Sequence, residues 1–245
     1  DALPILLAVL TCGGLCNNAE YHAPSKAHPE GQREGDPTEL ALLVACRKAG
    51  LGEDLFHRWP RLCEVPFESE RRCMSVIVAS PDVPATAHVK GAPDVIIGLS
   101  TRILDRGIER PMLPTDRQRF EEATVELASR ALRVLALARR RVLGATEDPS
   151  PEEVERELTF LGIVGMIDPP RPEVAPAVIR CQRAGLKTVM ITGDHQNTAE
   201  AVAREVGILR KGSQSLTGAE LDRMDDRELS RIIESVSVYA RVSPK

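Results

Sequence analysis

Thr192, Gly193 and Asp194 are the clearest candidates for chemistry in this sequence. They follow the apolar run Thr188 to Ile191, which predicts a buried strand, and they precede a helix expected from Asn197 onward. In open parallel sheets, ligands bind beyond the carboxyl ends of the strands, where the next helix offers free amides that suit phosphate. The Thr192 hydroxyl could bind phosphoryl oxygens, and Asp194 could reach Mg²⁺ or its waters. The alternative is that these residues only shape a turn, with Asn197 as a helix cap.

Phe67 is a second candidate, because the sequence has only 4 phenylalanines, 2 tyrosines and 1 tryptophan. It lies beside Arg71 and Arg72, where one predicted strand ends and the next begins. An aromatic ring at the mouth of a sheet can stack on adenine, and nearby arginines can contact phosphates. The alternative is an ordinary hairpin in which the ring joins the core and the charges are solvated.

Lys90, Gly91 and Arg133 are further candidates near strand ends. Lys90 ends a predicted strand before Gly91, where its ammonium could face a nucleotide or simply be exposed. Arg133 interrupts an apolar strand, which is costly unless the guanidinium reaches an edge or an anion. The segment that contains Glu39 has a sufficient structural explanation, in which Asp36 caps a helix that starts with proline.

The 6 cysteines are irregularly spaced, which fits a reducing compartment better than a disulfide framework. Cys12 and Cys16, with His22 and His28 nearby, could form a zinc site, but their spacing matches the usual ligand pairs poorly. The simpler interpretation places both cysteines as small core residues on one face of a helix. We therefore expect no metal site among them.

Composition and charge exclude several classes of protein. Hydrophobic residues make up 42% and charged residues 28% of the chain, which is typical of a globular protein rather than a disordered one. The net charge of -4 argues against a protein that coats nucleic acid. The apolar stretches are far shorter than the ~20 residues of a membrane-spanning helix. The Gly-rich signatures of common nucleotide sites are absent.

The elements predict an α/β protein of two domains. Up to residue 160, we expect an antiparallel α+β domain with helices at 2–16, 36–50 and 116–130, a loop at 21–35, and strands at 63–67, 74–79, 86–90 and 133–138. From residue 161, strands at 161–167, 188–191 and 236–240 alternate with helices at 173–184, 197–206 and 225–235. This alternation is typical of a doubly wound parallel sheet. Three strands are few for such a sheet, so we expect this domain to be incomplete and the chain to be part of a longer protein.

Seven motifs follow one another along the chain: GDPTE at 35–39, FESERRCMS at 67–75, KGAPD at 90–94, ALRVLALA at 131–138, GMIDPPRPEV at 165–174, MITGDHQNTA at 190–199 and YARVSP at 239–244. Together they resemble the cytoplasmic loop of a P-type cation-transporting ATPase, nearest to the calcium-pump branch. The resemblance implies a nucleotide-binding domain at 1–160 and part of a haloacid-dehalogenase-like phosphorylation domain at 161–245. Residues 168–171 would form the hinge.

The resemblance also implies an adenine site. Phe67 would stack on the base, Lys90 and Gly91 would line the pocket, and Glu39 would contact the adenine side of the nucleotide. Met74, in the same motif as Phe67, would belong to the same binding site.

The phosphate side of the site would use arginines. Arg133 would reach the phosphates, and Arg72 stands where the family often has lysine, so its contact would differ in geometry. Ser69 stands where some members have arginine, and we assign it no contact.

In the second domain, the resemblance implies that Thr192, Gly193 and Asp194 assist phosphoryl transfer and the later hydrolysis of an aspartyl phosphate. Arg241 would lie near the same site. The D-K-T-G-T motif of the phosphorylated aspartate and the G-D-G-x-N-D magnesium motif are both absent from the sequence. We therefore expect this chain to bind ATP or ADP without phosphorylating itself, and Mg²⁺ to be held mostly by residues outside it.

The partners implied are the remaining phosphorylation, actuator and transmembrane domains of a pump, with calcium as the expected ion. The chain would lie at the cytoplasmic face of a membrane protein, would be soluble and monomeric by itself, and would bind no nucleic acid. Two other functions stay open: a soluble haloacid-dehalogenase-type phosphatase, which shares the Thr-Gly-Asp strand end, and a nucleotide-binding module without chemistry.

Overall fold

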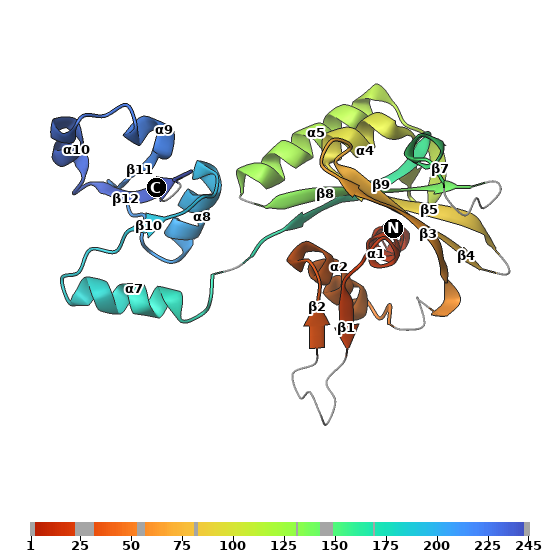
Figure 1. The fold of residues 1–245 in the computed structure, drawn as a ribbon, viewed down its shortest axis with the longest axis horizontal. Coiled ribbons are helices and arrows are strands. Elements are labelled where there is room, and N and C mark those ends of the chain that lie inside the picture. The colour runs from red at the N-terminus through yellow and green to blue at the C-terminus, as the bar shows by residue number, and fades with distance from the viewer. Residues whose placement is uncertain are drawn as a thin grey trace. The chain divides into compact units, whose positions relative to one another are not determined.

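The computed structural model describes residues 3–22, 32–52, 57–80, 83–130, 132–142, 149–168 and 170–242. The chain divides into two compact units (Figure 1), one of residues 1–124 and 134–166 and one of residues 125–133 and 167–245. The division after Met166 lies beyond the boundary at residue 160 that the sequence predicts.

The first unit is built on a seven-stranded sheet with the strand order β3-β4-β5-β8-β9-β6-β7. The pairs β3–β4, β4–β5, β5–β8 and β6–β7 are antiparallel, whereas β6 and β9 run parallel. The strands are β3 (Arg61–Glu68), β4 (Cys73–Ser80), β5 (Val83–Gly91), β6 (Ser100–Asp105), β7 (Ile108–Pro111), β8 (Arg133–Arg141) and β9 (Leu158–Met166). The predicted antiparallel meander corresponds to β3, β4 and β5.

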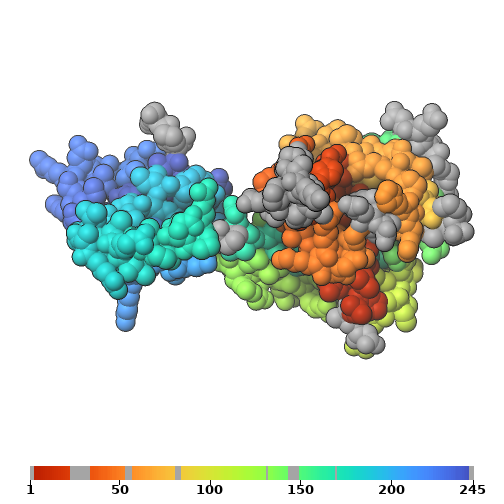
Figure 2. Space-filling model, turned by 90° about the horizontal axis from the view of Figure 1, so that it is seen from below, coloured from red at the N-terminus to blue at the C-terminus, as the bar shows by residue number. Residues whose placement is uncertain are grey.

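Helices cover both faces of this sheet (Figure 1). Helices α1 and α2 lie on one face, and α4 and α5 lie on the other. In the space-filling view of Figure 2, the surface of the face that carries α1 and α2 is formed mainly by orange residues from the α2 to β3 part of the chain. The remaining elements of this unit are α1 (Leu3–Leu15), β1 (Glu20–His22), β2 (Gln32–Glu34), α2 (Pro37–Lys48), α4 (Pro93–Leu99), α5 (Pro114–Ser129) and α6 (Pro151–Val154).

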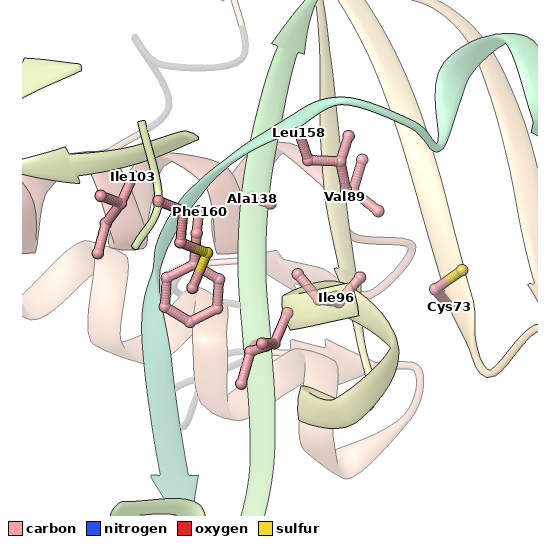
Figure 3. Packing of buried hydrophobic residues seen from close by; sticks show 10 residues of the cluster. Cys73, Val89, Ile96, Ile103, Ala138, Leu158 and Phe160 are labelled. Atoms are coloured by element: carbon pink, nitrogen blue, oxygen red, sulfur yellow. The ribbon is translucent and has the colours of Figure 1, made fainter. Parts of the chain in front are cut away.

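Alternation along the strands builds a core on each face of the sheet, because successive side chains of a strand point to opposite faces. Val89, Ala138, Leu158 and Phe160 belong to one buried cluster with Ile96 of α4 (Figure 3), and the Phe160 ring meets Phe120 of α5 at 4.7 Å between centroids. The side chains of the adjacent residues in these strands point to the opposite face of the sheet, where Leu137 and Leu161 pack with Val9 and Cys12 of α1.

This packing explains where the sequence misplaces a strand. The apolar run from Leu161 to Ile167 was expected to open the second domain, but the structure places it in β9, within the first sheet. Apolar side chains on both faces predict a strand in the middle of a covered sheet. They do not distinguish a doubly wound sheet from an antiparallel-dominated sheet that has helices on both faces.

The start of α2 follows its sequence signal. Asp36 is the N-cap and its carboxylate accepts a hydrogen bond from the Thr38 amide at 2.8 Å, with Pro37 at the first helical position. The predicted loop at 21–35 overlaps the short β1–β2 hairpin, in which Tyr21 pairs with Arg33. Residues 23–31, with His28, lie outside the described part of the chain.

The second unit has a three-stranded sheet with the order β10-β12-β11, and both of its strand pairs are parallel. The predicted alternation of helix and parallel strand is therefore found from α7 onward, without the strand expected at 161–167, and Ala199 and Ala203 of α8 pack on Val238 and Ala240 of β12. The elements of this unit are α7 (Val174–Arg183), β10 (Met190–Ile191), α8 (Gln196–Glu205), β11 (Gln214–Thr217), α9 (Gly218–Leu221), α10 (Asp226–Ile232) and β12 (Val236–Ala240).

Two strands of this unit differ from the sequence expectation. The strand predicted at Thr188 to Ile191 shortens to β10, and Ile191 is 70% exposed, so this strand is not buried. Among the described strands, β10 lies at the edge of the sheet and has a neighbour on one side only, β12. β11 was not predicted, because its sequence, QSLT, has one large apolar residue and no alternating pattern.

None of the helices in the described ranges has both the length and the apolar character needed to cross a membrane.

Replacing Phe160 with alanine is expected to destabilise the first unit by about 3–5 kcal/mol, because the ring is fully buried and its loss leaves a cavity. Urea unfolding followed by the fluorescence of Trp59, the 1 tryptophan of the chain, would measure this free energy. Phe67→Ala is a matched control: the same atoms are removed from a side chain that is 59% exposed. A stability loss for Phe67→Ala as large as that for Phe160→Ala would contradict this assignment of core and surface.

Candidate functional site

The ends of three neighbouring strands bring Phe67, Met74 and Lys90 together. Val65 pairs with Ser75 and Glu68 pairs with Cys73, so Pro66 and Phe67 both lie opposite Met74. Met74 in turn pairs with Lys90 on β5. A β-bulge of this kind re-aims side chains locally and is common beside functional sites. The three predicted residues therefore form one row across β3, β4 and β5.

The members of this row differ in burial in a way that suits a planar ligand. Met74 is 4% exposed and Lys90 6%, whereas the Phe67 side chain is 59% exposed. The ring of Phe67 is therefore not the core residue of an ordinary hairpin, which is the alternative that the sequence leaves open. An exposed ring beside a buried thioether and an ammonium offers a flat base both stacking area and a polar contact.

Lys90 is held in place by two oxygens. Its Nζ donates to Glu39 Oε1 at 2.5 Å and to the Cys16 carbonyl at 2.6 Å. Cys16 directly follows α1, and the carbonyls at a helix C-terminus carry partial negative charge that favours a cation. The side chains of Lys90 and Glu39 are only 8% and 13% exposed, so each charge depends on the other.

The Glu39 side chain takes part in contacts that capping of α2 does not explain. Its carboxylate accepts from Lys90 and also from the Asn18 amide at 3.1 Å. The capping of α2 is left to Asp36. The contacts with the Cys16 carbonyl and the Asn18 amide involve main-chain atoms, which every residue type has, so neither contact could be predicted from the sequence.

Gly91 and Arg72 bring β5 close to the β3–β4 turn. A Cβ at position 91 would meet the Arg72 carbonyl oxygen and the Cys73 Cβ at 2.6 Å each, so only glycine fits without movement. Arg72 has a φ of 53°, in the left-handed region that is uncommon for residues other than glycine. Its guanidinium pairs with Asp94 at 2.6 Å on the surface.

Arg133 lies at the same end of the sheet. It begins β8, whose residue Ala136 pairs with Gly91 at the end of the antiparallel strand β5. Arg133 is exposed, so its guanidinium does not carry the cost of burial that a charge in a strand interior would have. Within the first unit, the residues predicted for nucleotide binding therefore lie at one end of the sheet.

A cavity of about 610 Å³ lies in the first unit, with Asn18, Trp59 and Arg61 in its lining. It adjoins the contacts of Glu39, because the Asn18 main-chain amide donates to the Glu39 carboxylate. None of the residues predicted to bind nucleotide lines that cavity.

In the second unit, the main chain brings Thr192, Asp194 and Arg241 together. The Arg241 amide donates to the Asp194 carbonyl at 3.0 Å, and the Val242 amide donates to the Thr192 carbonyl at 3.2 Å. The Thr192 hydroxyl bonds with the Asp194 carboxylate at 3.0 Å, and Asp194 and Gly193 are exposed. These residues follow the parallel strands β10 and β12 at their carboxyl ends, where α/β sheets bind ligands.

The helix after this turn starts earlier than expected. The N-cap of α8 is His195, not Asn197, and the His195 side chain makes no capping hydrogen bond. The first amides of α8 are therefore not taken up by the cap side chain and can donate to an anion. Pro169, within the predicted hinge at 168–171, lies outside the described residues.

Across the described ranges, no group of three or more His, Cys, Asp or Glu residues is arranged to hold a metal ion. Cys12 and Cys16 are fully buried, and their Sγ atoms donate to main-chain carbonyls, Cys12 to Ala138 at 3.2 Å. Burial raises the pKa of the Cys16 thiol to about 12, although the Lys90 charge opposes this shift. Both cysteines act as core residues, as the simpler interpretation of the sequence predicts.

Comparisons with known proteins agree on one family. A family model described as "P-type ATPase, cytoplasmic domain N" matches residues 6–173. The chain is 43% identical over 242 residues to a calcium-transporting ATPase of Bacillus subtilis (strain 168), covering 98% of this chain and 27% of that protein. It is 39% identical over 232 residues to calcium-transporting ATPase 1 of Lactococcus lactis subsp. lactis (strain IL1403), with coverages of 94% and 26%.

A eukaryotic relative gives the same result. Calcium-transporting ATPase type 2C member 1 of Homo sapiens is 35% identical over 245 residues, which is 99% of this chain and 24% of that protein. The chain spans about a quarter of the length of these relatives.

Replacing Glu39 with glutamine is expected to lower the free energy of unfolding by about 3 kcal/mol or more, because the Lys90 ammonium stays buried without its counter-charge. Urea unfolding read by Trp59 fluorescence would measure it. Asp94→Asn breaks an ion pair whose side chains are 51% and 65% exposed, so it should change stability little. Adding Lys90→Met to Glu39→Gln should recover much of the loss. Equal effects of Glu39→Gln and Asp94→Asn would contradict the buried pair.

Proposed function

Because the chain belongs to the P-type ATPase family, we propose that its first unit binds adenine nucleotides at the sheet end that carries Phe67, Met74 and Lys90. The observation that carries this proposal is the row of these three residues with an exposed ring at its end. Adenine has two apolar faces and polar edges. The ring of Phe67 would stack on one face, and Lys90 and Glu39 would meet the polar edge.

The phosphates would extend toward the cationic rim of the same sheet end. Arg133 is exposed there, and Arg72 can exchange its surface partner Asp94 for a phosphate, because exposed ion pairs contribute little. The close approach at Gly91 keeps the Phe67 turn and the end of β5 in contact. We expect weak binding, with a Kd between roughly micromolar and millimolar, since only part of the phosphate side belongs to this chain.

The second unit would contribute to phosphoryl transfer. Thr192 and the amides at the start of α8 would bind phosphoryl oxygens, Arg241 would supply positive charge, and Gly193 would leave room for the phosphate. Asp194 is an exposed carboxylate beside a hydroxyl, a donor set that suits a hard cation. Magnesium bound there would neutralise phosphate charge, and catalysis would depend on positioning and charge rather than on covalent chemistry by these residues.

The whole protein would then use MgATP to phosphorylate an aspartate outside this chain and couple hydrolysis of that acyl phosphate to ion transport. Calcium is the proposed ion, because the relatives bear the name calcium-transporting ATPase. The other domains of such a pump would be the partners of this chain, at the cytoplasmic side of the membrane. Residues 168–171 would be the hinge between nucleotide-binding and phosphorylating parts.

Phe67→Ala is expected to weaken MgATP binding by about 1–3 kcal/mol, which is the cost of losing an aromatic ring stacked on a base. Isothermal titration calorimetry on the full chain would measure the change. Ile108→Ala, which removes an exposed apolar side chain from β7, should leave the affinity unchanged. An unchanged affinity in Phe67→Ala would remove this residue from the site.

Incubation of the chain with labelled ATP and Mg²⁺ is expected to leave no acyl phosphate on the protein, because the sequence contains no D-K-T-G-T motif. Acid quench followed by gel autoradiography would test this. A band that disappears on hydroxylamine treatment would identify an acyl phosphate and contradict the assignment of the acceptor to a residue outside this chain.

A further inference from the structure

Arg71 stabilises the turn beside Phe67 through hydrogen bonds to the two residues that flank the ring. Its guanidinium donates through Nη2 to the Pro66 carbonyl and through Nε to the Glu68 carboxylate at 3.0 Å. Pro66 and Glu68 are the residues on either side of Phe67, so one planar cation spans the backbone that carries the ring. The turn itself is closed by the Arg72 amide, which donates to the Glu68 carbonyl at 2.7 Å.

Glu155 holds Arg71 from the other side. Arg71 Nη1 donates to both carboxylate oxygens of Glu155, at 2.6 and 2.7 Å. The Glu155 side chain is 5% exposed and that of Arg71 19%, so water screens this pair weakly. The carboxylate also accepts from the Ser75 hydroxyl at 3.1 Å and from the Cys73 thiol at 3.3 Å.

These contacts place Glu155 on the other side of β4 from the proposed nucleotide-binding residues Phe67, Met74 and Lys90. Cys73 and Ser75 flank Met74 on β4, and side chains alternate along a strand, so Glu155 lies on the face of β4 opposite to the Met74 and Lys90 side chains. It is therefore positioned to support the site and not to touch a ligand bound there.

The Glu155 carboxylate is itself fixed by local structure. Glu155 directly follows α6, which begins with a capping box formed by Ser150 and Glu153. Val154, the last residue of α6, is 1% exposed and packs with Ile77 and Ala87 of the sheet. The carboxylate thus has little freedom to move away from Arg71.

We propose that Glu155 is a positioning residue for nucleotide binding, which acts through Arg71 to set the orientation of the Phe67 ring. This inference rests on the proposed function, since it requires Phe67 to contact the base. The ring is exposed and gains little from packing of its own, so its direction depends on the backbone that Arg71 holds. With a neutral residue at 155, Arg71 loses the more buried of its two carboxylate partners and keeps only Glu68, so the turn can relax.

The test is ATP binding by Glu155→Gln in the full chain, measured by nuclear magnetic resonance titration because weak binding must be read. We expect the affinity to fall about three- to tenfold, a part of the loss that removal of a stacked ring would cause. Glu157→Gln is the matched control, because Glu157 pairs with Arg140 at 3.3 Å and its side chain is 68% exposed. It should bind ATP as the unchanged chain does.

A double-mutant cycle separates positioning from mere support of the fold. In the Phe67→Ala background, Glu155→Gln should cause no further loss of ATP affinity, since there is no ring left to orient. A further loss of the same size as in the unchanged background would overturn the inference. Full affinity in Glu155→Gln alone would also overturn it, and would leave the nucleotide site itself intact.

Arg71→Lys provides a second variant in case Glu155→Gln does not fold. Lysine keeps the charge for Glu155 but cannot reach the Pro66 carbonyl and the Glu68 carboxylate together. ATP affinity should again fall, and again only when Phe67 is present. Absence of ATP binding by the unchanged chain would overturn the proposed function and this inference together.

Discussion

The buried ion pair between Lys90 and Glu39 is the constraint around which the first unit is arranged. It joins the end of β5 to the first turn of α2, and the bond from Lys90 to the Cys16 carbonyl adds the end of α1. Two charges withdrawn from water are tolerable only as a pair, so the three elements must meet at one point. That point adjoins Met74 and the exposed ring of Phe67, and the requirement for pairing therefore also locates the proposed adenine site.

β4 lies between the proposed nucleotide site on one face of the sheet and Glu155 on the other. Its alternating side chains send Met74 toward Lys90 on one face and Cys73 and Ser75 toward Glu155 on the other. Polar contacts hold the strand on one face, while on the other face Met74 packs with Leu15 and Cys16 and the exposed ring of Phe67 offers the surface for a ligand. A glycine at 91 lets the neighbouring strand approach the turn from the side, where any Cβ would collide with Arg72.

The sequence predicts features that depend on neighbouring residues and misses those that depend on distant ones. The Asp36 cap and the β3 to β5 meander follow from local spacing and were predicted correctly. The contact of Arg71 with Glu155 links residues 84 positions apart, and two ordinary charged residues give no sign of it. The placement of β9 failed for the same reason: its apolar pattern shows that both faces are covered but not by which domain. Family motifs supplied the residues proposed for the site, whereas their burial and pairing had to come from the structure.

The second unit positions its candidate residues by a different means. Main-chain hydrogen bonds from Arg241 and Val242 to the turn after β10 set the spacing of Thr192, Asp194 and Arg241, and Gly218 packs so closely that a Cβ there would meet the Arg241 carbonyl at 2.6 Å. Side-chain substitutions in this turn should therefore alter its chemistry more than its location. In the first unit the opposite holds, because the ring and its cations are placed by side-chain contacts. Under the proposed function, variation at Glu155 would thus shift nucleotide affinity through geometry alone, because Glu155 contacts Arg71 and not the ligand.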